Sequence, residues 1–229
     1  QFTTIKYCSG TTPANDYFNN RIALAGNLVS ASGDNNCASK EADEPNHAAS
    51  NIGGQSLWWS WTAPVSGLVN VTTCGSDFDT LLGVYTGTVV SALSPVAEND
   101  DNDYCGPGSR QSQLQFMASA GTQYQLAVDG YKYVAEAQPR AGRVSLQLSY
   151  VPQLLIQPTN SVIGPGMTNR YQILAAYPDG NLSDVTATAT LTSLSGAAQV
   201  VGLRNGYLLV RGISLGATEI SLLEMIKVY

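Results

Sequence analysis

The chain has 229 residues, of which 44% are hydrophobic and only 12% are charged, against roughly a quarter charged in an average soluble domain. This length suits one or two domains, and the low charge together with 22 glycines is typical of an extracellular all-β protein. The net charge of -6 argues against nucleic-acid and anionic-membrane partners, because binding to phosphates needs basic side chains. No apolar run reaches the roughly 18 residues of a membrane-spanning helix.

The chain begins at Gln1 without the basic and apolar leader of a secretory signal, so we expect a mature, processed and secreted product. The first candidate element is a short helix near Asn15–Leu24, which Asn15 and Asp16 are suited to cap. Short runs that are alternating or β-branched follow, separated by Gly, Pro, Asn or Asp as in a β-sandwich. The strands predicted here are Ser56–Thr62, Gly67–Thr73, Leu81–Tyr85, Gln113–Met117, Gln123–Val128 and Arg143–Tyr150. They define a first domain over residues 11–150, with an N-terminal extension at residues 1–10.

The first of these strands carries all three tryptophans of the chain. Trp59 and Trp61 fall on one face of the strand and Trp58 on the other. Aromatic rings can stack on sugars or prolines, but aromatic side chains are more often part of a core. We therefore expect these three to be packed in the interior.

The composition changes at Val151-Pro152, after which the chain contains no cysteine or tryptophan. Residues 151–229 are predicted to form a second β domain. Its strands are expected at Leu154–Gln157, Asn169–Tyr177, Thr186–Thr192, Gly206–Val210 and Thr218–Tyr229. Pro178–Asn181 is predicted to be a turn between two of them, because proline fixes φ and glycine accepts positive φ.

Six short motifs follow one another through the first domain: Asn15–Phe18, Glu41–Ala48, Leu57–Pro64, Gly75–Leu82, Asn99–Asp101 and Ala127–Gly130. Together they resemble the bacterial pre-peptidase C-terminal domain family over residues 15–150. The resemblance implies a jelly-roll-like β-sandwich that serves as an accessory module of secreted proteins rather than as a catalytic domain. Some members of that family bind calcium or extracellular polymers, so both are expected ligands.

The second domain carries a looser set of features: Leu155–Pro158, Tyr177–Gly180, Asp184–Thr186 and the glycines at 212 and 216. They resemble a group-two bacterial immunoglobulin-like domain, which implies an Ig-like sandwich of the kind used as a spacer in surface proteins. In that family a Gly-containing turn and a final strand follow the segment equivalent to Thr218–Leu223, whereas Ala217–Tyr229 contains no turn residue here. We therefore expect an incomplete sandwich, and an open sheet edge beside exposed core is a docking site.

Gln1–Tyr7 is a candidate for the missing strand. The segment is β-prone and places Thr3, Ile5 and Tyr7 on one face, with Phe2 off the alternation. A spare strand at one end and an open sandwich at the other are the arrangement of donor-strand complementation. The acceptor groove is predicted to contain Leu154, Ile156, Ile220, Leu222, Ile226 and Val228. Alternatively, Gln1–Tyr7 forms an edge strand within its own first domain. A further alternative is that the chain is a piece of a longer protein, so that the missing strand lies after Tyr229.

Two acidic loops offer hard oxygen ligands for calcium, which takes roughly six to eight of them. The candidates are Asp77, Asp79, Asp100, Asp101 and Asp103. Their spacing is not that of an EF-hand, which needs a fixed glycine and a terminal glutamate. A solvated acidic turn is the alternative interpretation.

The four cysteines contain no C-x-x-C pair, which disfavours a zinc site and favours two disulfides. Three pairings of Cys8, Cys37, Cys74 and Cys105 are possible. We favour Cys74–Cys105, because these residues flank two neighbouring loops, and Cys8–Cys37 by elimination. Free thiols are the alternative.

Three further features have less functional weight. Gly212–Gly216 matches the G-x-S-x-G nucleophile pattern, but it lies between two predicted strands, whereas that motif needs a strand-to-helix turn and a histidine partner. The single histidine, His47, belongs to no catalytic or metal-ligating set, so we expect a structural role. Asn70 and Asn181 begin N-glycosylation sequons.

The sequence thus predicts a non-enzymatic structural subunit of a secreted, pilus-like fibre, in which Gln1–Tyr7 of one copy enters the Ig-like domain of another. Such a contact is heterologous and repeats into a filament. The alternative is a secreted accessory module for calcium-dependent adhesion or substrate targeting in a larger hydrolase or adhesin. An enzyme is not favoured, because the sequence offers no set of nucleophile, base and orienting residue. Calcium is the only cofactor that the sequence suggests.

Overall fold

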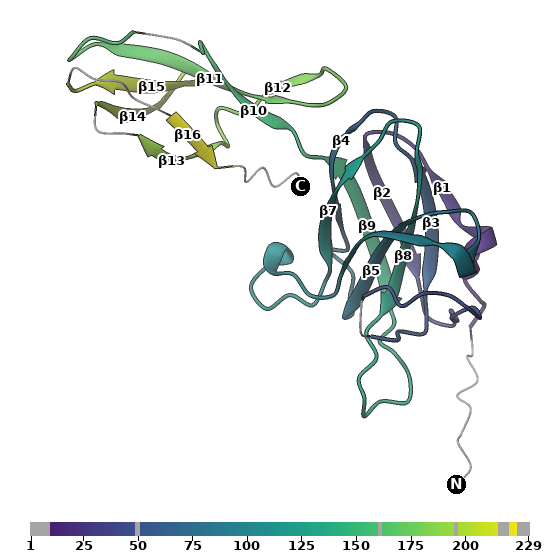
Figure 1. Ribbon diagram of the computed structural model, residues 1–229. Helices are drawn as coiled ribbons and strands as arrows, with labels where there is room; N and C mark the ends of the chain where they lie inside the picture. Colours follow the sequence, from purple (N-terminus) through teal and green to yellow (C-terminus); the bar gives the residue numbers. More distant parts are fainter. Residues whose placement is uncertain (1–9, 49–50, 160–161, 195–196, 215–219, 224–229) are drawn as a thin grey trace. The chain divides into compact units, whose positions relative to one another are not determined.

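The computed structural model describes residues 10–48, 51–159, 162–194, 197–214 and 220–223, with only the backbone described for 190–194 and 220–223 (Figure 1). The chain splits between Val151 and Pro152 into two compact units. Both are built from strands, which confirms the predicted all-β class. Helical segments among the described residues are three 3₁₀ turns: η1 (Phe18–Asn20), η2 (Val90–Ala92) and η3 (Asp103–Cys105). None of the described helical segments is long and apolar enough to cross a membrane.

The short helical turn expected near Asn15–Leu24 is confirmed only in part, because a single 3₁₀ turn, η1, forms there and a strand follows it at once. The two side chains expected to cap a helix are used elsewhere. Asn15 donates from Nδ2 to the carbonyl oxygen of Trp58 over 3.0 Å, and Asp16 accepts the backbone N–H of Ser39 over 2.6 Å. Long-range hydrogen bonds have therefore replaced the local ones that a helix cap would make.

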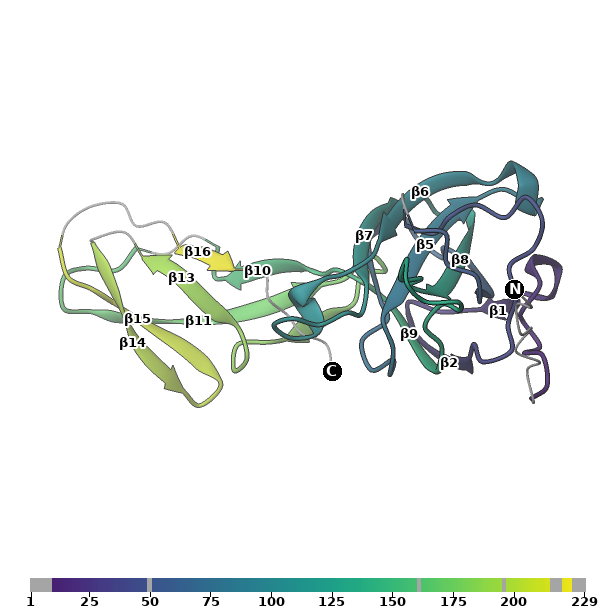
Figure 2. The same cartoon turned by 90° about the horizontal axis from the view of Figure 1, so that it is seen from below.

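The first unit is a sandwich of two sheets (Figures 1 and 2). One sheet has the strand order β1-β3-β8-β5-β6 and the other β2-β9-β4-β7; β1 runs parallel to β3 and the remaining pairs are antiparallel. The strands are β1 (Ile22–Leu24), β2 (Leu28–Asp34), β3 (Leu57–Thr62), β4 (Gly67–Thr72), β5 (Thr80–Thr86), β6 (Ser94–Asn99), β7 (Gln113–Ala118), β8 (Gln123–Gly130) and β9 (Arg143–Tyr150). The two inner faces meet where the ring of Trp61 lies 5.9 Å from that of Tyr150.

Both faces of β3 are buried, which explains why it can hold three tryptophans. Trp59 points toward Gly33 of the facing sheet, while Trp58 points to the opposite side of its own sheet. Three rings cover Trp58: Phe18, His47 and Tyr85, with centroids 5.1, 5.1 and 6.1 Å from that of its indole. None of the three indoles is more than 1% exposed, so they are core residues as expected.

The second unit contains a five-stranded sheet and a two-stranded sheet, with all pairs antiparallel. The larger has the order β10-β11-β15-β14, with β12 also beside β11, and the smaller pairs β13 with β16. The strands are β10 (Gln153–Gln157), β11 (Thr168–Ala176), β12 (Leu182–Asp184), β13 (Thr190–Leu194), β14 (Ala198–Arg204), β15 (Tyr207–Gly212) and β16 (Ile220–Leu223). The turn expected at Pro178–Asn181 joins β11 to β12, and the N–H of Gly180 donates to the carbonyl of Tyr177 over 2.9 Å.

One strand of this unit is displaced from its predicted position. A strand was expected at Thr186–Thr192, but β13 begins at Thr190. Thr186 is instead part of a turn, because its hydroxyl donates to Asp184 over 2.6 Å and accepts the backbone N–H of Ile173 over 2.9 Å. Of the strand expected over Thr218–Tyr229, β16 covers the part that the structure describes.

Candidate functional site

The inner face of the larger sheet in the second unit is apolar. Its residues come from four strands: Leu154 and Ile156 of β10, Tyr171 and Ile173 of β11, Leu208 and Val210 of β15, and Ala198 and Val200 of β14. Those of the central strands β11 and β15 are at most 5% exposed, whereas those of β10 and β14 are only partly buried. The core of this unit is therefore closed at its centre and less covered toward its edges.

In the described part of the second unit, the other layer of the sandwich is the two-stranded sheet of β13 and β16 (Figures 1 and 2). Among the described residues, β16 pairs with β13 and with no second strand. An unpaired edge presents a row of N–H and C=O groups to any strand that docks there. The predicted groove residues Ile220 and Leu222 belong to β16, and Leu154 and Ile156 to the facing inner side of β10. The remaining predicted residues lie outside the described part of the chain: Phe2, Thr3, Ile5 and Tyr7 of the donor and Ile226 and Val228 of the groove.

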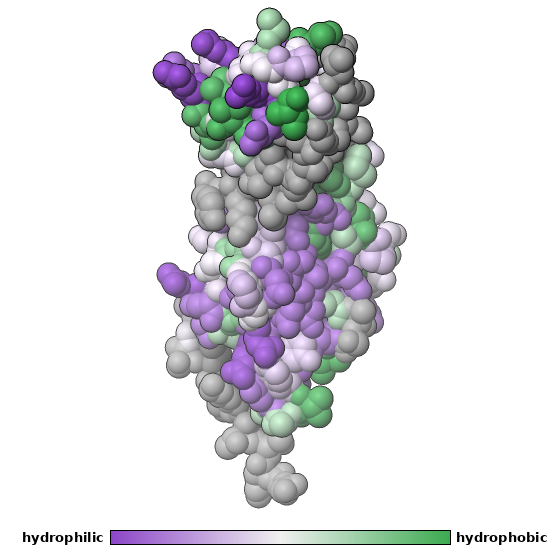
Figure 3. Space-filling view, turned by 90° about the vertical axis from the view of Figure 1, so that its left-hand side faces the viewer, coloured by the Kyte–Doolittle hydropathy of each residue, from purple (hydrophilic) through white to green (hydrophobic). Residues whose placement is uncertain are grey.

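The second unit also exposes apolar side chains outside this core. Val162, Met167, Leu182, Val201, Leu203 and Ile213 are each more than half exposed. Apolar patches are visible on this unit in the upper part of Figure 3, whereas the first unit shows a mostly polar face in the same view. Scattered exposed apolar side chains are normal on a protein surface, so these residues by themselves assign no contact region.

A cluster of three carboxylates lies at one end of the first unit. Asp79 precedes β5, and Asp100 and Asp101 follow β6, its neighbour in the sheet. One oxygen atom of each carboxylate lies within 4.8 Å of one oxygen atom of each of the other two. Asp79 is buried, Asp100 is half-buried and Asp101 is exposed, so the cluster opens toward solvent on one side.

Hydroxyl groups and a disulfide hold the acidic loop in place. Oγ of Ser112 lies 2.6 Å from the carbonyl oxygens of both Thr80 and Asp100, so its hydroxyl proton can donate to either of them and ties the loop to β5. Cys74 and Cys105 form the predicted disulfide, with their Cα atoms 5.4 Å apart. Cys37 is also disulfide-bonded, and its expected partner Cys8 lies outside the described residues.

The carboxylates of the cluster are short of hydrogen-bond donors. Oδ1 of Asp79 and Oδ1 of Asp100 are both shielded from solvent and have no hydrogen-bond partner among the residues that the structure describes. Burial, together with the charges of Asp101 and Asp79, raises the pKa of Asp100 to about 6, against an opposing effect of Arg110. Burial also raises the pKa of Asp79, although the hydroxyl of Tyr133 donates to its Oδ2 over 2.5 Å.

This donor set fits a hard divalent cation. All the oxygens are carboxylate oxygens, and two of them are buried without a partner from any described residue, which is costly unless a proton or a cation compensates. The fit does not extend to the whole predicted set. Asp77 accepts the backbone N–H of Arg143 over 2.8 Å, and Asp103 accepts that of Gly108 over 2.9 Å, so these two carboxylates are committed outside the cluster.

Acidification without metal is expected to stabilise the first unit through Asp100. Its pKa is about 6 in the folded chain and near 3.8 when unperturbed, so the folded state binds the proton more tightly. Stability from this group therefore rises as the pH falls from 7 through 6 toward 4, and it is lost as the pH rises. Allowing for solvent screening, we expect an effect of about 1 kcal/mol.

Urea denaturation in EDTA at pH 4.5 and 7.0 measures this effect as the difference between the wild-type chain and Asp100→Asn. The gain at low pH should be smaller in Asp100→Asn by about this amount, while the matched control Asp77→Asn should retain the full gain of the wild type. Equal pH dependence in wild type and Asp100→Asn would show that this carboxyl has an ordinary pKa.

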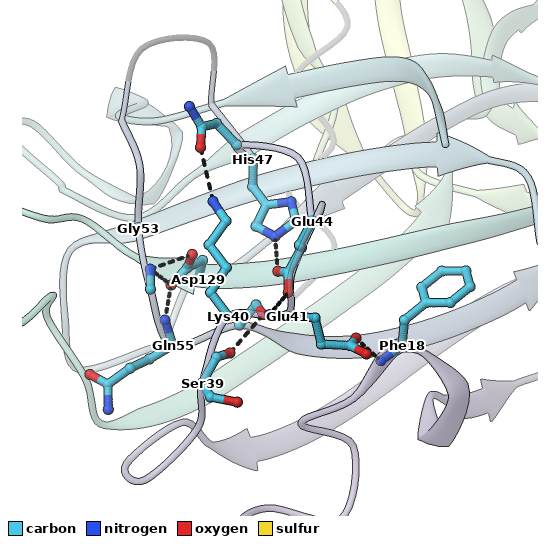
Figure 4. A network of polar contacts seen from close by, with 12 residues as sticks. Phe18, Ser39, Lys40, Glu41, Glu44, His47, Gly53, Gln55 and Asp129 are labelled. Atoms are coloured by element: carbon cyan, nitrogen blue, oxygen red, sulfur yellow. Dashed lines mark hydrogen bonds and ion pairs between the residues drawn. The ribbon is translucent and has the colours of Figure 1, made fainter. Parts of the chain in front are cut away.

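A buried polar network holds the segment over the outer face of β3 (Figure 4). Nε2 of His47 lies 2.7 Å from Oε1 of Glu44, and its Nδ1 lies 2.9 Å from the hydroxyl of Tyr85. Glu44 also accepts the backbone N–H of Glu41 over 2.8 Å. The imidazole is fully buried with both nitrogens engaged, which is the setting of a structural residue.

Asp129, in β8, anchors the neighbouring loop in the same network (Figure 4). Its carboxylate accepts the backbone N–H groups of Gly54, Gln55 and Gly130 at 2.7 to 3.0 Å. Burial raises its pKa, and the His47 charge and these hydrogen bonds oppose the rise. Gly53 is required here, because its φ is +54° and a Cβ would lie 1.8 Å from Oδ2 of Asp129.

The two sequons differ in accessibility. Asn70 is in β4, is only 8% exposed and accepts a hydrogen bond from Nε2 of Gln113. The side chain is therefore largely covered in the folded chain, and the sequon stays a prediction. Asn181 lies exposed in the β11–β12 turn, and its sequon stays a prediction.

Comparisons with known proteins found no matching family model and no matching curated protein. Similar solved structures include the pre-peptidase C-terminal domain of collagenase from Bacillus anthracis, with 14% identity, a TM-score of 0.33, and coverage of 56% of this chain and 92% of that chain. Another is PliG of Aeromonas hydrophila, a periplasmic inhibitor of g-type lysozyme, with 15% identity, a TM-score of 0.34, and coverage of 56% and 94%. Likenesses at this level assign neither a family nor a function, so the family resemblance stays a prediction.

Proposed function

We propose that this chain is a secreted structural subunit that polymerises into an extracellular fibre, with Gln1–Tyr7 of one copy completing the second unit of the next. The observation that carries the proposal is that β16, within the part of the chain that the structure describes, pairs with β13 alone and lies beside a partly covered apolar core. Main-chain pairing along such an edge supplies affinity, and pockets for alternate side chains supply register.

The sequence pattern of Gln1–Tyr7 matches what this edge needs. An added strand points every second side chain at the core, and Thr3, Ile5 and Tyr7 occupy such alternate positions. Donor and acceptor are different surfaces of the same chain, so each subunit can give one strand and receive another. Such a heterologous contact produces a filament when the rotation between successive subunits does not close into a ring, and the filament is the outcome we propose.

Deleting residues 1–7 is expected to abolish filaments and leave soluble subunits, because the donor is removed while the acceptor is kept. Electron microscopy and size-exclusion light scattering of the native chain and the deletion variant measure this directly. A labelled Gln1–Tyr7 peptide should then bind the deletion variant with one copy per subunit, as fluorescence anisotropy would report. Normal fibres from the deletion variant would refute the proposal.

A pair of point variants makes the test specific to the face of the strand. Ile5→Asp puts a charge on the face that would enter the apolar core, whereas Thr4→Asp puts the same charge on the opposite face. We expect Ile5→Asp to prevent assembly and Thr4→Asp to permit it. Equal behaviour of the two variants would mean that Gln1–Tyr7 does not dock as a strand with this register.

A second function is favoured by the Asp79–Asp100–Asp101 cluster. Buried carboxylate oxygens without partners suit a cation-stabilised accessory module that serves in adhesion or substrate targeting. A monodisperse species near the chain mass of 24.2 kDa, together with calcium binding, would favour this function over the fibre. Filaments that form equally well in EDTA and in calcium would show that assembly does not depend on the cation site.

A further inference from the structure

We propose that Arg110 is a tethered counter-ion of the Asp79–Asp100–Asp101 cluster, which a divalent cation displaces when it binds. The cluster would then alternate between a form closed by arginine and a form filled by the cation. This inference rests on the cation site of the second function above and is independent of the fibre.

The position of Arg110 supports a loose electrostatic contact. Its Nη1 lies 3.5 Å from Oδ2 of Asp79 and 3.8 Å from Oδ2 of Asp101. Both distances exceed those of a good N–H···O hydrogen bond, and neither carboxylate is held in a bidentate pair. The guanidinium therefore balances charge at the cluster without fixing its geometry.

The exposure of the side chains indicates which partner can leave. The Arg110 side chain is 60% exposed, whereas that of Asp79 is 5% exposed, so the guanidinium approaches the cluster from the solvent side. The backbone of Arg110 is held, because its carbonyl accepts the N–H of Thr80 over 3.0 Å. The side chain can thus turn outward while the loop that carries it stays in place.

The buried side of the cluster shows what Arg110 leaves unsatisfied. Within the described part of the chain, Oδ1 of Asp79 and Oδ1 of Asp100 remain without a hydrogen-bond partner although the arginine is present. Three carboxylates also carry more negative charge than a single guanidinium balances. A divalent cation with short bonds to carboxylate oxygens would satisfy both needs, and it would repel the guanidinium at the same time.

This competition has a consequence for affinity. Each binding event must first break the contacts of Arg110, so the site fills only at a higher cation concentration than the carboxylates alone would require. Calcium sites of extracellular modules typically work at about 0.1 to 1 mM. Arg110 would keep this site in that range and leave it empty at lower calcium.

Calorimetric titration of CaCl₂ into the metal-free full-length chain tests the proposal. Arg110→Gln is expected to bind calcium about three- to tenfold more tightly than wild type, because the competing charge is gone. Arg143→Gln is the matched control, since it removes the same charge from a residue whose partner, Asp77, lies outside the cluster. It should leave calcium affinity unchanged, and Asp79→Asn should weaken binding in both backgrounds.

The possible failures are distinguishable. Wild-type binding with the same or weaker affinity in Arg110→Gln would overturn the role of Arg110 and leave the cation site standing. Binding that Asp79→Asn does not weaken would place the calcium elsewhere and overturn both. No heat of binding from either wild type or Arg110→Gln at millimolar calcium would also overturn both, without bearing on filament formation.

Discussion

Replacing Asp129 with alanine is expected to lower the free energy of unfolding of the first unit by about 3 to 5 kcal/mol. The carboxylate is fully buried and accepts three backbone N–H groups, from Gly54, Gln55 and Gly130. Without it these donors stay buried with no acceptor, and each such group costs about 1 to 3 kcal/mol. Urea denaturation followed by tryptophan fluorescence measures the loss, because the indoles lie in the core of the same unit.

Two further variants make this result interpretable. Asp129→Asn keeps one acceptor oxygen but turns an amide N–H₂ toward backbone donors, so we expect an intermediate loss of about 2 kcal/mol. Asp34→Asn makes the same charge change at an exposed aspartate and should shift stability by less than about 0.5 kcal/mol. Alanine and asparagine variants as stable as wild type would mean that the loop at residues 51–55 does not depend on this carboxylate.

The strands that were not predicted from the sequence share one physical property. The structure adds five strands to those predicted: β1, β2, β6, β12 and β14, and all five lie at the edge of a sheet. An edge strand needs hydrogen bonds on one side only, so it tolerates residues that a central strand excludes. Pro95 in β6 and Gly202 in β14, each beside an irregularity in pairing, are examples. Central strands such as β3 and β8 are buried on both faces, and their composition made them predictable.

The carboxylate cluster was predictable only in part, because residues that lie close together across two paired strands can be far apart in the sequence. Asp79 and Asp100 lie close together because β5 and β6 are paired. No sequence pattern around either residue predicts that pairing. Asp77 and Asp79 sit two residues apart, yet the first pairs with Arg143 and the second joins the cluster. Tyr133 reaches Asp79 from the loop after β8, and no signal in the sequence connects these two residues.

Removing the Cys74–Cys105 disulfide is expected to have the second large effect. The bond joins residues 31 positions apart, and loop-closure entropy predicts a loss of about 3 to 4 kcal/mol for the Cys74→Ser/Cys105→Ser variant. Calcium binding should weaken together with stability, because the bond restrains the loop that carries Asp100 and Asp101 near Asp79. Urea denaturation gives the first quantity and calorimetric titration of CaCl₂ the second.

The double variant is preferable to chemical reduction, because Cys37 is disulfide-bonded too and a reductant would change both bonds. A ligand that binds only the folded state stabilises it by RT ln(1 + [L]/Kd), so at the same calcium concentration the tighter-binding wild type should gain more unfolding free energy than the variant. An equal gain in both would mean that Ser112, through its hydrogen bond to the carbonyl of Asp100, positions the acidic loop without the disulfide. In that case Ser112→Ala should weaken calcium binding, whereas the cysteine variant should bind calcium with the wild-type affinity.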